Sequence, residues 1–219
     1  IKNYQNLETI LSELPSGSIL VGGYIRDLIL DRLSNPPDID IVIPNNSLEI
    51  GKNIAEKYSG KLLILDQNRN IVRIIFRNFT IDIVNQTHEL LSDDLKSRDF
   101  TINSVGFSFD NQQLIDPSNG IYDLNNSLLR SYYCENLVDD PLRILRCFRF
   151  VSELNFKIEP HILKFIELNK FQLKTVSVER IQYELKKIVQ GKEALKTVQF
   201  LNDIKIFEWV QSYENIHSN

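Results

Sequence analysis

The stretch Asp38–Ile43 reads D-I-D-I-V-I and is bounded by prolines on both sides. Its period of two residues is typical of a β-strand, in which successive side chains point to opposite faces. Asp38 and Asp40 therefore project from one face, while the isoleucines between and after them pack on the other. This strand constrains the fold because it requires partner strands, an apolar layer against one face, and a second face that accepts two carboxylates.

The rest of the first 130 residues predicts the partners of this strand. Further strands are expected at Ser18–Val21, Leu62–Leu65, Ile71–Phe76 and Phe79–Val84, and helices at Tyr24–Leu33 and Ser47–Tyr58. After about Leu129 the pattern becomes helical, with helices expected at Pro141–Leu154, His161–Leu168, Val178–Val189 and Glu193–Phe207. We therefore expect an α+β chain: a head at residues 1–130, with a mixed β-sheet and flanking helices, and an all-helical neck at residues 131–219 with a frayed tail after Val210.

Composition is that of a soluble globular protein. The 219 residues are 42% apolar and 25% charged, and no apolar run is long enough to cross a bilayer. The start lacks the features of a signal peptide, and only two cysteines, Cys134 and Cys147, are present, so we expect a cytoplasmic protein without membrane contact. Two cysteines alone are also too few for the usual zinc set. The net charge is −4, but residues 130–219 hold 14 Lys and Arg against 12 Asp and Glu, which favours a phosphate-binding surface there. No obligate protein partner is evident.

Two carboxylates at one point of a strand are a candidate metal site. Asp38 and Asp40 repel each other unless a hard cation such as Mg²⁺ neutralises them, and Asp82, in a similar alternating stretch, would join them if its strand lies alongside. A metal pair held in this way activates a terminal hydroxyl and stabilises both oxygens of a phosphoryl displacement. The alternative is that the pair is solvated on an exposed strand face and that Asp82 lies on the surface of an edge strand.

Gly22 and Gly23 stand between an expected strand and an expected helix. Without side chains, their backbone N–H groups can approach a phosphate, and Arg26, one turn into the helix, would reach the same phosphate. The sequence matches neither the P-loop nor the dinucleotide fingerprint. A plain tight turn, with Arg26 in a local ion pair with Asp27, is the alternative.

The expected helix Pro141–Leu154 carries Arg143, Arg146 and Arg149 at intervals of three residues, and apolar side chains point in nearly every other direction. Such a helix is expected to be mostly buried, so its arginines need anionic or hydrogen-bonding partners. Asp140 with Arg143 would offer an acceptor and a donor fork to the edge of a nucleobase. A structural network of salt bridges explains the same arginines without a ligand.

Taken together, these segments resemble the class II tRNA nucleotidyltransferase and bacterial poly(A) polymerase family, from about Ile19 to Gly191. The resemblance lies in motifs that follow one another in the family's order: LVGGYIRDLIL, DIDIVI, SRDFTINSVGF, IDPSNGIYDL, DDPLRILRCFRF and VSVERIQYELKKIVQG. It implies a nucleotidyltransferase head and a helical neck.

The resemblance also implies roles for individual residues. Asp38 and Asp40 match the metal ligands, and Gly23 and Arg26 match triphosphate-binding positions. The remaining matches are a nucleotide-contacting arginine (Arg98), two positions associated with the sugar (Asp99 and Asn103), two residues that select the base (Asp140 and Arg143) and two that support them (Arg146 and Arg149).

The activity that the resemblance implies is the template-independent addition of C and/or A, from CTP or ATP with Mg²⁺, to the 3′ end of tRNA, with release of pyrophosphate. Only 11 residues separate Asp82 from Asp94, where CCA-adding members generally carry a longer loop, and this favours a CC-adding enzyme or a divergent subgroup. Two alternatives remain open: a poly(A) polymerase of the same fold, and a non-catalytic module that binds nucleotide or RNA.

Overall fold

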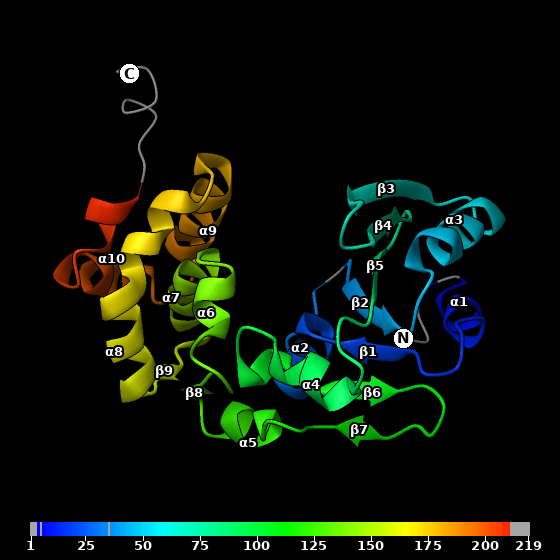
Figure 1. Cartoon of the computed structure of the whole chain (residues 1–219), viewed down its shortest axis with the longest axis horizontal. Helices are drawn as coiled ribbons and strands as arrows, with labels where there is room; N and C mark the ends of the chain where they lie inside the picture. Colours follow the sequence, from blue (N-terminus) through cyan, green and yellow to red (C-terminus); the bar gives the residue numbers. More distant parts are fainter. Residues whose placement is uncertain (1–3, 5, 35, 211–219) are drawn as a thin grey trace. The chain divides into compact units, whose positions relative to one another are not determined.

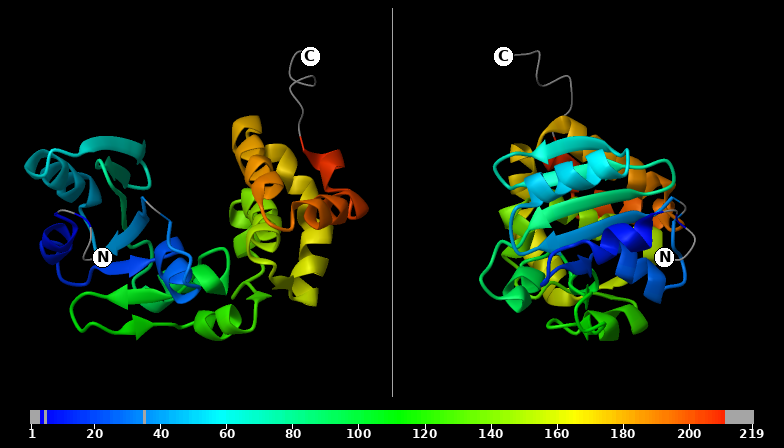
Figure 2. Two further views of the ribbon diagram at one scale, coloured as in Figure 1. Left: turned by 180° about the vertical axis from the view of Figure 1, so that it is seen from behind. Right: turned by 90° about the vertical axis from the view of Figure 1, so that its right-hand side faces the viewer.

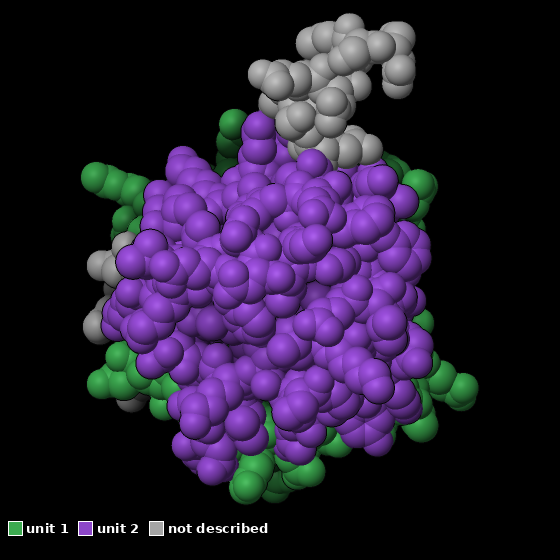
Figure 3. Space-filling model, turned by 90° about the vertical axis from the view of Figure 1, so that its left-hand side faces the viewer, with its two compact units in different colours: residues 1–96, 102–124 green, residues 97–101, 125–219 purple. Residues whose placement is uncertain are grey.

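The computed structural model describes residue 4 and residues 6–34 and 36–210, and within them the chain divides into two units (Figure 1). Residues 1–96 and 102–124 belong to the first, which we call the sheet unit, and residues 97–101 and 125–219 to the second, the helical unit (Figure 3). The frayed tail expected after Val210 lies outside the described residues. Among the described helices, none has both the length and the apolar character that crossing a membrane requires.

The sheet unit is built on seven strands in the order β3-β4-β5-β2-β1-β6-β7. Their bounds are β1 Ile19–Val21, β2 Asp38–Ile43, β3 Lys61–Asp66, β4 Ile71–Ile75, β5 Thr80–Asn85, β6 Gly106–Ser108 and β7 Leu114–Ile115. Strands β2 and β5 run parallel and the other neighbours antiparallel, which confirms the expected mixed sheet. The parallel pair sets two alternating stretches side by side in the middle of the sheet.

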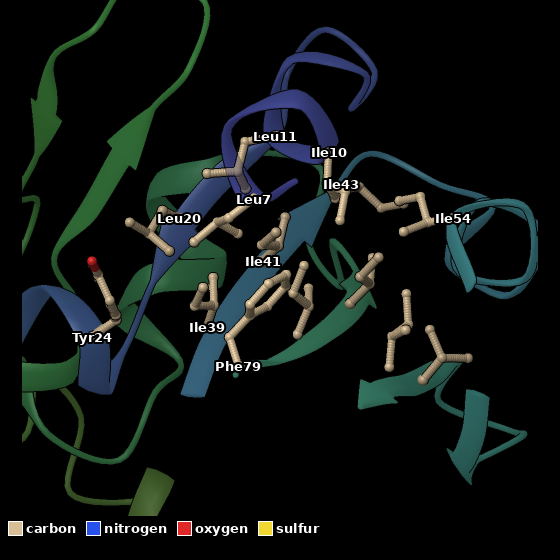
Figure 4. Close-up of a cluster of buried hydrophobic side chains, with 14 of the residues drawn as sticks. Leu7, Ile10, Leu11, Leu20, Tyr24, Ile39, Ile41, Ile43, Ile54 and Phe79 are labelled. Atoms are coloured by element: carbon tan, nitrogen blue, oxygen red, sulfur yellow. The ribbon is translucent and has the colours of Figure 1, made fainter. Parts of the chain in front are cut away.

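One face of the sheet carries the main core. Ile39, Ile41 and Ile43 of β2 are at most 2% exposed and pack with the buried residues of the neighbouring strands and of α1 (Leu7–Ser12) (Figure 4). Helix α3 (Ser47–Lys57) covers β3, β4 and β5 (Figure 2). Each such side chain contributes about 1.5–3 kcal/mol through burial, so the alternation in the sequence fixes which face of β2 turns inward.

The opposite face is covered only in part. Val42 of β2 packs with Ile19 and Val21 of β1 and with Leu95 of α4 (Leu91–Lys96). Helix α2 (Gly23–Ile29) follows β1, and α5 (Gly120–Asn125) follows β7. The amino-terminal parts of β2 and β5 carry polar residues on this face, namely Asp38, Asp40, Thr80 and Asp82.

The helical unit packs around one buried helix. Helix α7 (Leu142–Leu154) contacts α9 (Val178–Gln190) and α10 (Ala194–Asp203), and most of its residues are buried, as its apolar surroundings predicted. The other elements are α6 Asn136–Asp139, α8 Pro160–Asn169 and the 3₁₀ helices η1 Thr101–Asn103, which spans the unit boundary, η2 Lys170–Thr175 and η3 Ile206–Trp209.

The structure corrects several predicted elements. The neck is helical but not all-helical, because β9 (Lys157–Ile158) pairs with β8 (Leu128–Leu129), and two-residue strands are too short to show a period. Helix α2 ends at Ile29 and not at the predicted Leu33, because Asp31 takes a positive φ of 50°. The helix expected at Glu193–Phe207 stops at Asp203, because Lys205 has a φ of 56°.

Candidate active site

The three carboxylates named by the sequence lie on two adjacent strands. In the parallel register Asp40 is opposite Asp82, and Asp38 is opposite Thr80. All three carboxylates therefore stand on one face of the sheet, opposite the isoleucine core. Asp38 is exposed, whereas Asp40 and Asp82 are half-buried.

Asp82 is held by an arginine that the sequence analysis did not single out. Arg73 on β4 is opposite Asp82 in the antiparallel register, and it donates from Nε to Oδ1 over 2.8 Å and from Nη2 to Oδ2 over 2.7 Å. These hydrogen bonds, followed by the charges of Asp82, Asp38 and Asp40, raise the pKa of Arg73 above its ordinary value, against the opposing effect of burial. The signal in the sequence is a single charge inside the apolar run I-V-R-I-I.

The donor set fits Mg²⁺ better than a metal that needs a full protein cage. Within the described ranges, no group of three His, Cys, Asp or Glu side chains is arranged to hold a metal ion. Mg²⁺ is usually bound by one or two carboxylates together with waters and substrate phosphates. Asp38 and Asp40, two residues apart on β2, could supply these carboxylates.

The glycine turn begins next to Asp40. Val21, the last residue of β1, is opposite Asp40, and Gly22 follows it with φ 75° and ψ −140°, a conformation that essentially only glycine adopts. Gly23 begins α2, and a Cβ on it would lie 3.4 Å from Nη2 of Arg26. The turn therefore brings bare backbone close to the carboxylates.

Arg26 is 9% exposed and is held on two sides. Its Nε and Nη2 donate to Asp27 over 3.0 and 2.9 Å, so the local ion pair considered from the sequence is present. Its Nη1 donates to Oδ1 of Asn103 over 2.7 Å. The structure thus joins the residue expected at the triphosphate to one expected at the sugar.

In the helical unit, Asp99 and Arg146 form a close pair. Arg146 donates from Nε to Oδ2 of Asp99 over 2.7 Å, and its Nη2 lies 2.6 Å from the same oxygen. Asp99 is 4% exposed, and its Oδ1 accepts from its neighbour, the backbone N–H of Phe100. The half-buried Arg98 next to it has a buried Nε that finds no hydrogen-bond partner in the described part of the chain.

The residues expected to select the base lie at the start of α7. Nη1 of Arg143 donates to the carbonyl oxygens of Asn136, over 2.8 Å, and Ser97, over 3.1 Å. Asn136 in turn donates from Nδ2 to the carbonyl oxygen of Arg98 over 2.8 Å. Oδ2 of Asp140 accepts from Nη2 of Arg180 over 2.8 Å. These bonds tie the start of α7 to the segment that carries Arg98.

Arg149 lies deeper in the same unit and faces a second residue that sequence analysis missed. Its Nη1 donates to Oε1 of Glu184 over 3.3 Å, and Arg149 and Glu184 are 7% and 2% exposed. Burial, and then the charge of Arg146, lower the pKa of Arg149 below its ordinary value. The signal for Glu184 was a carboxylate on the apolar face of α9, between Ile181 and Ile188.

Comparison with protein-family models gives two matches. Residues 18–130 match the model described as "Poly A polymerase head domain", which covers more than half of the chain. The chain belongs to this family. Residues 155–213 match a second model, described as "Probable RNA and SrmB- binding site of polymerase A".

Curated relatives of this family member are longer proteins. A CC-adding tRNA nucleotidyltransferase of Synechocystis sp. is 37% identical over 80% of this chain and 42% of its own length. One of Geobacter sulfurreducens is 34% identical over 77% and 39%. An A-adding tRNA nucleotidyltransferase of Halalkalibacterium halodurans is 28% identical over 93% and 52%. The chain thus spans about 40–50% of the length of these relatives.

Solved structures agree with the family and with the fold. A CCA-adding enzyme in complex with CTP has a TM-score of 0.77 and 30% identity, over 88% of this chain and 47% of that one. A tRNA nucleotidyltransferase with a primer tRNA and an incoming ATP analog has a TM-score of 0.75 and 26% identity, over 91% and 61%.

Proposed function

We propose that this chain is the nucleotide-adding part of a tRNA nucleotidyltransferase, which transfers C and/or A from CTP or ATP to the 3′ end of tRNA and releases pyrophosphate. The observation that carries the proposal is the carboxylate pair Asp38 and Asp40 on the exposed end of a central strand, with the glycine turn at Gly22 beside it. The names of the relatives and of the ligand-bound neighbours support it.

The family to which the chain belongs typically uses a divalent metal. We propose that Asp38 and Asp40 hold this metal and that it is Mg²⁺. When bound, Mg²⁺ would lower the pKa of the attacking 3′-hydroxyl and neutralise charge on the departing pyrophosphate. The chain itself would orient the triphosphate through the bare backbone of Gly22 and Gly23 and through Arg26, which would exchange part of its hydrogen bonding to Asp27 and Asn103 for phosphate oxygens.

The helical unit would recognise the nucleoside. The unpaired buried Nε of Arg98 is a donor that a nucleotide would satisfy, and Asp99, together with Asn103 of the sheet unit, would contact the sugar. Asp140 and Arg143 would present an acceptor and donors to the base edge, while Arg146 and Arg149 support the helix through Asp99 and Glu184. Discrimination would come from the half-buried polar groups of Asp140 and Arg143, which the wrong base leaves unpaired.

We further propose CC addition as the specific activity. The chain between β5 and α4 is a tight turn: Nε2 of Gln86 donates to the carbonyl oxygens of His88 and Glu89 over 2.6 and 3.0 Å, and Thr87 donates from its backbone N–H to Asp94 over 2.8 Å. A turn closed in this way leaves little freedom for the rearrangement expected of a switch from CTP to ATP. Four of the relatives are named CC-adding tRNA nucleotidyltransferases.

The test is extension of three tRNA transcripts, ending before the CCA, after CC and complete, each with CTP, ATP or both and Mg²⁺, with products sized on a gel. We expect two C residues on the first transcript only. Addition of A to the second would assign A or CCA addition instead, and a long A ladder would favour a poly(A) polymerase. Binding of CTP and RNA without extension would favour the non-catalytic module.

A further inference from the structure

Arg73 lies in one row with the carboxylates but has no part in the proposed transfer. The registers set Arg73 on β4 opposite Asp82 on β5, and Asp82 opposite Asp40 on β2. Because opposed residues point to the same face, these side chains form a line across three neighbouring strands. The side chains of Arg73 and Asp82 are 39% and 22% exposed, so the line borders solvent.

The guanidinium of Arg73 binds the carboxylate of Asp82 through both of its oxygens. Both carboxylate oxygens accept a hydrogen bond from it, over 2.8 and 2.7 Å, which is the bidentate geometry of a strong charge-assisted pair. Both oxygens of Asp82 are thereby engaged by a residue of β4. Among the described residues, the three carboxylates do not form a three-ligand metal group.

We infer that Arg73 is a positioning residue that lowers the affinity of the site for a divalent cation in the absence of nucleotide. It keeps Asp82 out of the ligand set and neutralises one of three carboxylates. A site of Asp38 and Asp40 alone then binds a divalent cation poorly until the phosphates of a nucleotide complete the coordination. The cation would enter with the nucleotide and leave with pyrophosphate. This inference rests on the proposed function for its purpose, and on the geometry of the sheet for its mechanism.

The charge effect alone is large enough to measure. Strands lie about 4.8 Å apart, so the guanidinium would be roughly 8 Å from a cation at Asp40. At that distance and at an effective dielectric constant of about 40–80, a unit charge changes the affinity for a divalent cation about 5- to 30-fold. Removing Arg73 also frees Asp82 as a third ligand, so both effects strengthen metal binding.

The experiment is titration of the chain with Mn²⁺ in the absence of nucleotide, with free Mn²⁺ followed by electron paramagnetic resonance. The variants are Arg73→Met and Arg73→Gln, each checked for folding by circular dichroism. The matched control is Arg69→Met, on the same hairpin, whose guanidinium lies 3.8 Å from Asp66 and is 72% exposed. We expect both Arg73 variants to bind Mn²⁺ at least about 5-fold more tightly than the unaltered chain, and the control to match it.

Two double variants locate the effect. Adding Asp82→Asn to Arg73→Met restores the net charge of the row and should return the affinity to near that of the unaltered chain. Adding Asp38→Asn should abolish the gain. Equal or weaker Mn²⁺ binding by the Arg73 variants, no binding by any of them, or a gain that survives Asp38→Asn overturns the inference. A chain that fails to extend tRNA while its Arg73 variants bind Mn²⁺ tightly refutes the proposed function and leaves the inference standing.

Discussion

Glu184 is the buried acidic partner of Arg149 in the helical unit. Replacing Glu184 by Gln removes the negative charge of the carboxylate without changing the volume of the side chain. Glu184 is 2% exposed, and its Oε1 accepts from Arg149 over 3.3 Å. The next acid, Glu153, lies 3.8 Å from Nε of Arg149 and is only 25% exposed, so it supplies partial compensation. Removal of one partner of a buried pair costs about 3–5 kcal/mol, and with Glu153 present we expect about 2–4 kcal/mol.

The loss is measurable because the chain has a single tryptophan, Trp209, and it lies in the helical unit. Its fluorescence during urea unfolding reports the stability of that unit, and the expected change corresponds to a fall in Tm of roughly 5–15 °C. Glu193→Gln is the control, because Glu193 pairs with the largely exposed Lys196 and should cost about 0.5 kcal/mol or less.

A double variant distinguishes loss of the charge pair from loss of packing. Arg149→Met combined with Glu184→Leu removes both charges, and replacing a buried pair with apolar residues is often neutral or stabilising. We therefore expect the double variant to be more stable than Glu184→Gln alone. A loss below about 0.5 kcal/mol for Glu184→Gln, or a double variant less stable than the single one, would refute this reasoning.

Three further changes test other parts of the structure. Gly22→Ala should cost about 1–3 kcal/mol, visible in thermal unfolding followed by circular dichroism, because φ 75° and ψ −140° are strained for alanine. Iodoacetamide should label only Cys134 in the folded chain, as mass spectrometry would show, because burial raises the pKa of the Cys147 thiol and hides it. Asp99→Asn should lower the urea midpoint by removing the charge opposite Arg146, and an unchanged midpoint would contradict the buried pair.

Much of the sheet could be predicted from the sequence because its central strands alternate. The bounds of β2 were predicted without error, and β4 and β5 within a residue at each end, since burial of one face imposes a period of two. Strands β6 and β7 have three and two residues and carry no period, so sequence patterns did not indicate them. Strand β6 takes its place by pairing with β1, and β7 by pairing with β6, which are tertiary effects.

The residue types of the candidate site and the local pair of Arg26 with Asp27 could be predicted, but the partners that lie far apart in the sequence could not. Asp38, Asp40 and Asp82 were found because a charge stands out in an apolar strand. Arg73 stands out in the same way, but its role becomes visible only when the register sets it opposite Asp82. Likewise, nothing in the local sequence indicates that Arg143 donates to the backbone of Ser97, 46 residues away.

Asp38 and Asp40 are the residues on which the proposed transfer of nucleotides to tRNA depends. The most direct measurement is incorporation of labelled CTP, with Mg²⁺, into a tRNA transcript that ends before the CCA, by the unaltered chain and by the variant with both Asp38→Asn and Asp40→Asn. We expect addition of two C residues by the unaltered chain, and a loss of at least about 1000-fold in the variant, because the metal ligands are gone while the fold remains. Equal incorporation by both, or none by the unaltered chain, would contradict this expectation.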